Sequence, residues 1–348
     1  MSKAAELANL IGNINMGGGG VNRNVIINGA MNVAQRSTSV TGLGANTSAS
    51  TRYQTIDRFG IDVEGTTLGR YTMTQDSSAP SGFANSLKLA CTTADTSIGA
   101  AELVTLSQIV EGQNVQSFAK GTSDAKPFAV SFYVKGNASA TYVCELFDGD
   151  NSRHVAKTFS VTTDWTRVSI SFPADTTGAF GDDNGASLYL QIFLHAGSNF
   201  NSGTLPATWA SKTNANRAVG GGSFFDSTSR TFFLTGVQLE VGQNPTDFEH
   251  EPIERTLAKC QRYFYKETYQ SDGSSTFGPF FCQYTPEYRF AHIFHPVKMR
   301  AVPTSTFSSN ESSSEFYSSE NHFKAYVIEA DTSSTSKYLT AYQAEAEL

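Results

Sequence analysis

Four side chains of one strand-like segment are the best candidates for binding a ligand. Because successive side chains of a strand point to opposite sides, the odd positions of residues 188–195 share one face. Aromatic rings on such a face can stack on a sugar, and amide and imidazole groups can exchange hydrogen bonds with its hydroxyls. The pattern predicts a carbohydrate groove; the alternative is a strand face covered by a loop or another subunit. The four residues are Tyr189, Gln191, Phe193 and His195.

A tryptophan in a long polar segment is the next candidate. Residues 199–223 are rich in Asn, Ser, Gly and Thr and contain Trp209. Loops of this length are uncommon in compact domains and are often functional. Trp209 is therefore a candidate sugar contact; the alternatives are that it pins the loop to the domain or faces a neighbouring subunit. Trp165 directly precedes an alternating strand and is predicted instead to seal the core.

No catalytic motif accompanies these residues. The sequence has no G-x-S-x-G, H-E-x-x-H or G-x-x-x-x-G-K motif and no dinucleotide fingerprint after a strand. His292 and His295 are three apart, so on a strand they point to opposite faces and cannot share a metal. Paired carboxylates of a depolymerase leave no sequence spacing, and nothing favours them. We predict a protein that is not an enzyme and holds no cofactor and no metal.

One short acidic run is an alternative metal site, against the prediction that the protein holds none. Residues 182–184 read Asp-Asp-Asn before Gly185 and could supply oxygen ligands to calcium. A solvated turn is the commoner use of such residues. The turn is therefore the expected structure, and calcium is the alternative.

The elements that must position these residues are strands with alternating apolar side chains. Many short strands of this kind, separated by turn signals, predict a β-sandwich. Strict alternation in the last strand places Phe233 on the same face as Val237 and opposite Leu234. The segments with period two are 128–134, 168–172, 188–194 and 231–241.

The order of these segments resembles the carbohydrate-binding-module-like jelly rolls of tail-fibre and related virion proteins of tailed bacteriophages. The resemblance spans nearly the whole chain, and every block in it is a packing signature. The blocks within the sandwich are AVSFYVKG at 129–136, TDW at 163–165, VSISF at 168–172, residues 188–197 and TGVQLEVG at 235–242. The flanking blocks are NRNVIINGAMNVAQR at 22–36, DRF at 57–59, VKMRAVPT at 297–304 and AEAEL at 344–348.

Pattern and resemblance together imply an all-β protein with three parts. Residues 1–21 are expected to form a short N-terminal helix and a glycine-rich linker. Residues 22–252 are expected to form an antiparallel jelly-roll β-sandwich, and residues 253–348 a smaller β-rich C-terminal domain. The chain has 348 residues, which is long for one domain. Within the last part, residues 308–321 are too polar for a core and predict an exposed loop.

The N-terminal segment carries an apolar stripe at helical spacing. A helix of about a dozen residues is marginal alone in water, so the stripe needs a partner. The partner is either another subunit or virion protein, or the sandwich of the same chain. Four glycines at 17–20 favour the first option, because they would decouple the helix from the body. The stripe consists of Leu7, Leu10, Ile11 and Ile14.

Charge and hydropathy exclude several classes of protein. The formal charge of −7 and the absence of a basic run argue against a nucleic-acid partner. No run of about twenty apolar residues exists, so no membrane insertion is expected. The N-terminal segment is too polar for a secretory signal, which predicts folding in the cytoplasm. The widely spaced cysteines at 91, 144, 260 and 282 predict buried thiols and no disulfide.

The resemblance implies a function that the residues alone do not. It implies a non-enzymatic virion component of a tailed phage, assembled in the host cytoplasm, that acts as a tail fibre or adhesin in attachment to a host surface glycan. The alternative is a capsid, neck or tail decoration, or head-fibre protein, with a purely structural role. The implied partners are other virion proteins and further copies of the chain, in a homotrimer as is usual for the family it resembles.

Overall fold

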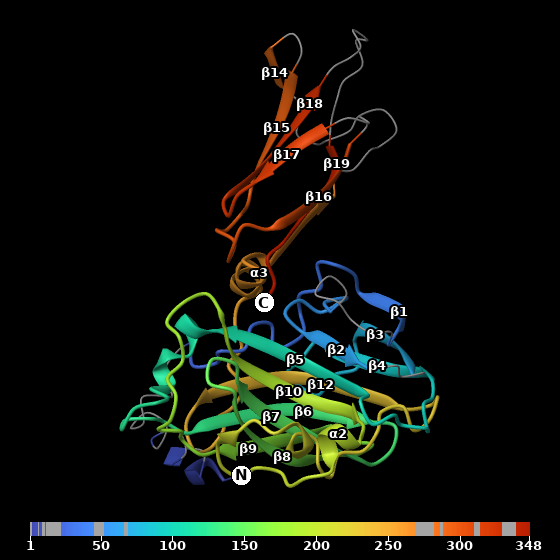
Figure 1. Ribbon diagram of the computed structural model, residues 1–348, viewed down its shortest axis with the longest axis vertical. Helices are drawn as coiled ribbons and strands as arrows, with labels where there is room; N and C mark the ends of the chain where they lie inside the picture. The colour runs from blue at the N-terminus through green and yellow to red at the C-terminus, as the bar shows by residue number, and fades with distance from the viewer. Residues whose placement is uncertain are drawn as a thin grey trace. The chain divides into compact units, whose positions relative to one another are not determined.

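Antiparallel strands build both parts of the chain (Figure 1). The structure is a computed structural model, and it describes residues 2–5, 7–8, 11, 22–44, 52–65, 69–268, 282–285, 288–309, 314–328 and 339–348. The chain divides into two compact units, Met1–Pro252 and Ile253–Leu348. The predicted all-β fold with a short N-terminal helix is confirmed, since the described residues 3–5, 7–8 and 11 are helical.

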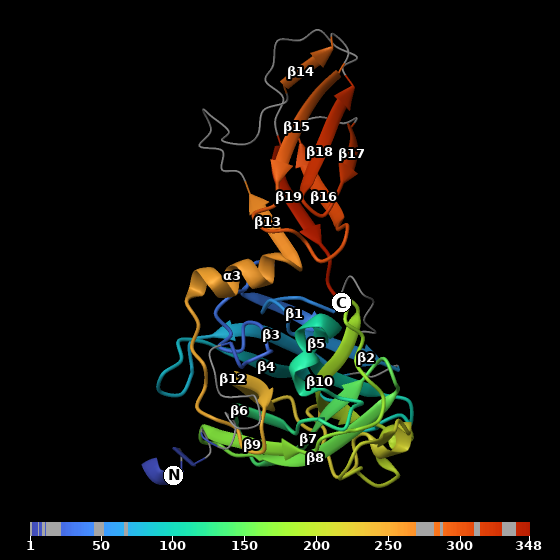
Figure 2. The same cartoon turned by 90° about the vertical axis from the view of Figure 1, so that its left-hand side faces the viewer.

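Two six-stranded sheets form the sandwich of the first unit (Figures 1 and 2). The first sheet has the order β1 (Ser39–Leu43), β3 (Arg70–Asp76), β4 (Ser86–Thr93), β12 (Thr231–Val241), β6 (Phe128–Gly136) and β9 (Thr166–Phe172). The second sheet has the order β11 (Ala210–Ser211), β8 (Arg153–Val161), β7 (Ala140–Asp148), β10 (Ala186–Ala196), β5 (Leu103–Glu111) and β2 (Gly60–Glu64).

The chain crosses repeatedly between the two sheets, as in a jelly roll. It passes from β4 in the first sheet to β5 in the second and back to β6, and it crosses again between β9 and β10. The pairs of both sheets are antiparallel. Short helices lie in the connections: η2 (Gly112–Asn114), η3 (Gln116–Phe118), α2 (Ser198–Asn201) and η4 (Asn214–Asn216).

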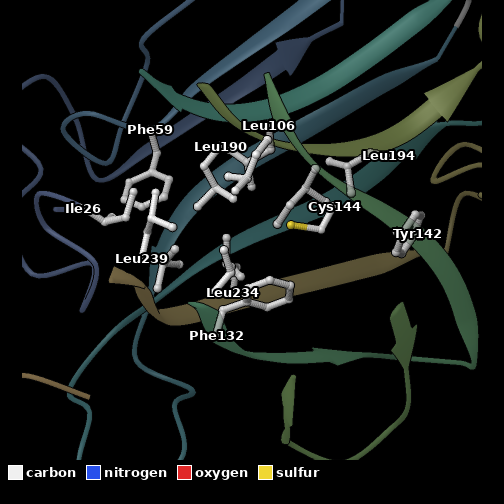
Figure 3. Packing of buried hydrophobic residues seen from close by; sticks show 14 of the residues in the cluster. Ile26, Phe59, Leu106, Phe132, Tyr142, Cys144, Leu190, Leu194, Leu234 and Leu239 are labelled. Atoms are coloured by element: carbon white, nitrogen blue, oxygen red, sulfur yellow. The ribbon is translucent and has the colours of Figure 1, made fainter. Parts of the chain in front are cut away.

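The core lies between the inner faces of the two sheets. Figure 3 shows Leu106, Leu190 and Leu194 of the second sheet packing with Phe132 and Leu234 of the first. Each large apolar side chain that is fully buried there stabilises the fold by about 1.5–3 kcal/mol. The predicted inner positions of 128–134, 168–172 and 188–194 all belong to this core or pack against it.

A β-bulge in β12 overturns the strict alternation predicted for that strand. Phe232 and Leu234 face the core, but so do Val237, Leu239 and Val241, while Phe233 lies on the outer face. The register shifts between Thr235 and Gln238, and Gly236 between them has a φ of 62°. A glycine adopts this left-handed conformation at little cost. The inserted residue moves the apolar positions from even to odd numbers.

The second unit begins with helix α3 (Ile253–Gln261). One sheet has the order β13 (Phe264–Thr268), β19 (Leu339–Glu345) and β16 (Thr304–Ser309). The other has the order β14 (Cys282–Thr285), β15 (Tyr288–Phe294), β18 (His322–Ile328) and β17 (Ser314–Ser318). The loop predicted at 308–321 is therefore wrong in part, because β17 lies within it and pairs with β18.

Two further predictions concern thiols and membranes. Cys91, Cys144 and Cys260 are free and buried, in line with the expectation of buried thiols, and the side chain of the fourth cysteine lies outside the described residues. Across the part of the chain that the structure describes, no helix is both long and apolar enough to cross a membrane.

Candidate functional site

Strand β10 places the four predicted ligand-binding residues on one face, the outer face of the second sheet. The register puts Tyr189 between Ile109 of β5 and Phe147 of β7. It puts Gln191 between Ser107 and Glu145 of the same strands. The even-numbered leucines and isoleucine of β10 point the other way, into the core. The structure therefore brings the predicted residues together as a row.

Residues 197–223 close most of this row. Phe193 packs with Phe200 and Ala218 of that segment in a small apolar cluster and is only 1% exposed. Gln191 accepts a hydrogen bond of 2.6 Å from Arg217 Nη2. The groove expected at Gln191 and Phe193 is therefore filled by protein, as in the alternative of a strand face covered by a loop. A single sequence cannot show which face its long loop covers, because the docking is a tertiary event.

A buried ion pair fixes the covering segment to the sheet. Arg217 Nη2 lies 2.6 Å from Glu145 Oε2, and His154 Nδ1 lies 2.8 Å from the other carboxylate oxygen. The Arg217 guanidinium also lies over the ring of Phe193, 5.1 Å from its centroid. Glu145 and His154 are fully buried. Removing one partner of such a pair leaves a buried charge without compensation, so the contact holds segment and sheet together.

His195 at the end of the row is also buried. Its Nδ1 lies 2.8 Å from Ser223 Oγ, and its Nε2 lies 3.1 Å from Glu102 Oε2. Both ring nitrogens thus have partners in the protein, and none of the ring is exposed. His195 is not placed to meet a sugar hydroxyl.

Of the two tryptophans, Trp209 takes the alternative role of pinning its loop, and Trp165 does not seal the core as predicted. Trp209 is 8% exposed, belongs to the main core and lies 5.4 Å from the ring of Phe128. Its indole N–H donates a hydrogen bond of 2.9 Å to the Pro173 carbonyl. It therefore pins the polar segment to the sandwich and offers no free ring to a sugar. Trp165 is half-buried on the outer face of the first sheet, with its ring centroid 6.0 Å from that of Phe233.

Tyr189 remains the accessible member of the predicted row. It is half-buried, and its ring centroid lies 5.3 Å from that of the half-buried Phe147. Lys212 Nζ lies 5.0 Å from the Phe147 centroid. An ion pair of 2.9 Å joins Arg52 to Asp62 of β2. We call Tyr189, Phe147, Lys212, Arg52 and Asp62 the Tyr189 cluster.

The charged members Arg52 and Asp62 act electrostatically on the tyrosine. Burial raises the pKa of the Tyr189 phenol; the positive charge of Arg52 opposes this shift, and the charges of Asp62 and Asp150 add to it. Burial also raises the pKa of Asp62, against the opposing charge of Arg52. A phenol, a guanidinium and a carboxylate therefore lie within electrostatic reach of one another beside an aromatic pair.

Local contacts fix the geometry of the cluster. Arg52 Nη2 donates a hydrogen bond of 2.6 Å to Ser107 Oγ, which anchors the guanidinium to β5. Gly149 allows the turn after β7 to approach the tyrosine, because a Cβ at this position would lie 2.9 Å from Tyr189 Cε2. The arrangement combines an aromatic surface with fixed donors and acceptors, the combination that small-ligand sites use.

A pocket of the first unit is a concave feature apart from the Tyr189 cluster. Its volume is about 770 Å³. Lys157 Nζ donates a hydrogen bond of 2.6 Å to the Ser171 carbonyl on its wall. Phe172 lines it but is fully buried, so the ring is not a free stacking surface. Sequence reasoning missed this pocket because its walls come from separate segments: 125–127, 157, 171–174, 207–208 and 243–244.

The Asp-Asp-Asn run at 182–184, the alternative calcium site, makes a local hydrogen bond. Asp183 Oδ1 accepts the Gly185 N–H at 2.8 Å, which is the bond expected of a turn.

The apolar stripe of the N-terminal helix is described at two of its four residues: Leu7 is 57% exposed and Ile11 is 50% exposed. Leu10 and Ile14 lie outside the described residues.

Comparisons with known proteins find only distant similarities. No family profile and no curated protein matches the chain. One similar solved structure is a CBM4, which is 11% identical to this chain and has a TM-score of 0.30. The match covers 62% of this chain and 97% of the CBM4 chain. A TmCBM61 structure with β-1,4-galactotriose has 9% identity, coverages of 63% and 99%, and a TM-score of 0.31.

A third similar structure is the family 11 carbohydrate-binding module of the cellulosomal cellulase Lic26A-Cel5E of Clostridium thermocellum. It is 11% identical to this chain and has a TM-score of 0.29. The match covers 60% of this chain and 100% of the module. The similar structures are thus carbohydrate-binding modules, but at these scores the jelly-roll assignment rests on the strand order of the chain itself.

Proposed function

We propose that the protein binds glycans without acting on them, at the Tyr189 cluster on the outer face of the second sheet. The observation that carries the proposal is the packing of half-buried Tyr189 beside Phe147, with the Arg52–Asp62 pair within electrostatic reach of the phenol. The rings supply an apolar surface for a sugar ring. Arg52 supplies donors and Asp62 supplies acceptors for its hydroxyls.

The proposed binding is weak at a single site. A stacking contact and a few hydrogen bonds that compete with water support a Kd of roughly millimolar to micromolar. Several copies on one particle raise avidity by about 10² or more without any new contact. Attachment to a surface that displays many copies of one glycan suits such a site.

A glycan array probed with the fluorescently labelled full chain tests the proposal. We expect a set of bound glycans for the wild type, a loss of at least about tenfold in signal for Tyr189→Ala, and partial retention for Tyr189→Phe. The melting temperatures of both variants control for folding. Binding that Tyr189→Ala leaves unchanged would place the site elsewhere.

We further propose that the protein is a virion component of a tailed phage, a tail fibre or adhesin. Two observations support this role: the sequence blocks that resemble such proteins, and the exposure of Leu7 and Ile11 on the N-terminal helix. An apolar stripe on a short helix is best explained by contacts with a virion protein or with copies of the same chain in a homotrimer. Cross-linking from this helix in assembled particles identifies its neighbour.

The alternative is a capsid, neck or tail decoration with a purely structural role. The closure of the predicted row by residues 197–223 favours it, because the covered strand face cannot bind a sugar. A tail or baseplate neighbour in the cross-linking experiment supports the adhesin. A major capsid neighbour, with wild-type adsorption of Tyr189→Ala particles, supports the decoration.

A further inference from the structure

Three buried side chains with metal-binding groups meet at the end of the closed row. Asp95, Glu102 and His195 each place one ligand atom within 4.8 Å of those of the other two. Asp95 is 4% exposed, Glu102 is 6% exposed and His195 is fully buried. Surface acids gather often without binding an ion, but two carboxylates and an imidazole gathered in a buried site need a physical explanation.

Backbone hydrogen bonds hold the two segments that carry these residues. Asp95 and Glu102 lie on the connection from β4 to β5, and the Asp95 N–H donates to the Phe225 carbonyl at 2.9 Å. The Gly197 N–H, just after β10, donates to the Glu102 carbonyl at 2.8 Å. The side chains are therefore brought together by the fold, from positions up to 100 residues apart in the sequence.

The His195 ring is held so that Nε2 faces the Glu102 carboxylate, 3.1 Å from Oε2. Ser223 Oγ lies 2.8 Å from Nδ1, and the same oxygen accepts the Phe225 N–H at 3.0 Å. A histidine that binds a metal usually donates its other ring N–H to a fixed oxygen, which sets the tautomer and the ring orientation. Ser223 is placed to be that oxygen. With the ring proton on Nδ1, Nε2 presents its lone pair on the side where Glu102 Oε2 lies, 3.1 Å away.

Charge gives the second reason to expect an ion. Two carboxylates this close in a buried site repel each other. The Ser97 N–H donates to Asp95 Oδ1 at 3.2 Å and His195 Nε2 lies 3.1 Å from Glu102 Oε2, and a cation between the two carboxylates would reduce the repulsion that remains. A divalent cation between them relieves the repulsion and uses the imidazole lone pair as well. Such an ion lies at about 2.0–2.2 Å from nitrogen and oxygen ligands, so three ligand atoms that lie within 4.8 Å of one another need to move closer together around it.

We propose that Asp95, Glu102 and His195 bind a divalent transition-metal ion, with Zn²⁺ the best match to the donor set. Imidazole nitrogen suits zinc and its neighbours, whereas calcium and magnesium prefer sites made of oxygen alone. We assign the ring proton of the metal-free protein to Nε2, 3.1 Å from Glu102 Oε2. On binding, the proton moves to Nδ1, where it donates to Ser223, and Nε2 binds the ion.

The bound ion would tie the β4–β5 connection to the end of β10. The Ser223 contact extends this tie to the segment that covers the predicted row. The site is therefore a structural clamp on residues 197–223, and its role is independent of glycan binding at the Tyr189 cluster.

A competing surface pair must be removed before the site is tested. The exposed His292 and the half-buried His322 of the second unit have ring centroids 4.7 Å apart and could bind the same ions weakly. The measurements therefore use the tag-free full chain with His292→Gln as the reference protein, after treatment with a chelator and its removal.

Co²⁺ and Zn²⁺ are the probes. We expect one Co²⁺ per chain with visible absorption bands, displacement of Co²⁺ by Zn²⁺, and a melting temperature that rises with free Zn²⁺ concentration. Affinity should fall in acid, because a protonated imidazole cannot bind the ion. No Co²⁺ spectrum and no change in melting temperature up to millimolar Zn²⁺ would overturn the proposal, without any need for a further variant.

Three variants then assign the site. Glu102→Gln keeps the shape of the side chain and should weaken Zn²⁺ binding at least 100-fold. Ser223→Ala removes the partner of Nδ1, together with the acceptor of the Phe225 N–H, and should weaken Zn²⁺ binding about 10- to 100-fold. Glu64→Gln, at an exposed carboxylate of β2, is the matched control and should bind as the reference does. Wild-type affinity in a folded Glu102→Gln variant shows that the hydrogen-bonded triad holds no ion.

Discussion

Arg217 Nη2 lies 2.6 Å from Gln191 Oε1, so a residue of the long polar segment occupies the strand face where a sugar groove was expected. The same nitrogen lies 2.6 Å from Glu145 Oε2, and its neighbour Ala218 packs on that face beside Phe193. The segment is therefore part of the folded sandwich. Its docking leaves Tyr189, at the other end of the row, as the accessible residue.

Arg217→Ala should lower the free energy of unfolding by about 3–5 kcal/mol, because it leaves the fully buried Glu145 without its cation. Urea denaturation followed by tryptophan fluorescence measures the change. Arg230→Ala is the control: its ion pair with Asp226 is partly exposed, and its loss should cost about 1 kcal/mol or less. Equal losses in the two variants would show that the buried pair does not hold the segment.

Trp209→Ala should destabilise the protein by about 3–5 kcal/mol, since it removes a core ring and leaves the Pro173 carbonyl without its donor. Trp165→Ala should cost about 1 kcal/mol, because that ring is half-buried outside the core. Thermal melting of both variants compares them directly. A larger loss for Trp165→Ala would reverse the assignment of the two rings.

Acid should destabilise the first unit partly through Asp175. Burial alone would raise the pKa of this carboxyl, but hydrogen bonds from Arg153 and the Thr177 amide, and the charge of Lys120, lower it below the ordinary value of 3.8. A lowered folded-state pKa contributes stability above the unfolded-state pKa, and this contribution is lost as the pH falls through the folded-state pKa.

Asp175→Asn should therefore flatten the decrease in unfolding free energy as the pH falls from about 5 to about 2. Urea titrations at a series of pH values measure the slope. Asp164→Asn, at an exposed carboxylate, provides the comparison. If Asp175→Asn keeps the wild-type slope, other carboxylates carry the acid sensitivity.

Deleting residues 1–21 should leave the body folded and abolish self-association. The first residues after the deletion are bonded to the rest of the unit, since the backbone nitrogens of Asn22 and Asn24 donate to the Glu249 carboxylate at 2.6 and 3.0 Å. The melting temperature should change by less than about 2 °C. Native mass spectrometry should show a trimer for the full chain and a monomer for the deletion.

A point variant separates the apolar stripe from the rest of the segment. Leu7→Asp places a charge on a residue that is 57% exposed and should also give a monomer, whereas Lys3→Gln should leave the trimer intact. A monomeric full chain at micromolar concentration would contradict the proposed assembly. A large decrease in melting temperature on deletion would show that the helix packs on its own sandwich.

The strands themselves could be predicted because their inner faces alternate without interruption. Residues 128–134 and 188–194 have period two, and their apolar positions enter the core as expected. The same rule applied to Trp165 would have corrected its assignment. The core positions of β9 are even-numbered, so an odd-numbered neighbour points away from the core.

The remaining errors come from contacts that no local pattern encodes. The bulge at Gly236 changes the face of every later residue in β12, and a single glycine in a strand does not say whether it will bulge. The docking of Arg217 on Glu145 joins residues 72 apart in the sequence. His195 belongs with Asp95 and Glu102 for the same reason: the fold, and no spacing, brings the three together.

The affinity of two aromatic variants for the glycan selected on the array is the most direct test of which face binds. Tyr189→Ala removes the accessible ring of the second sheet, and Trp165→Ala removes the half-buried ring of the first. Isothermal titration should give a Kd at least about tenfold weaker for Tyr189→Ala and within about twofold of wild type for Trp165→Ala. The reverse result, with Trp165→Ala losing affinity and Tyr189→Ala keeping it, would contradict a site on the second sheet.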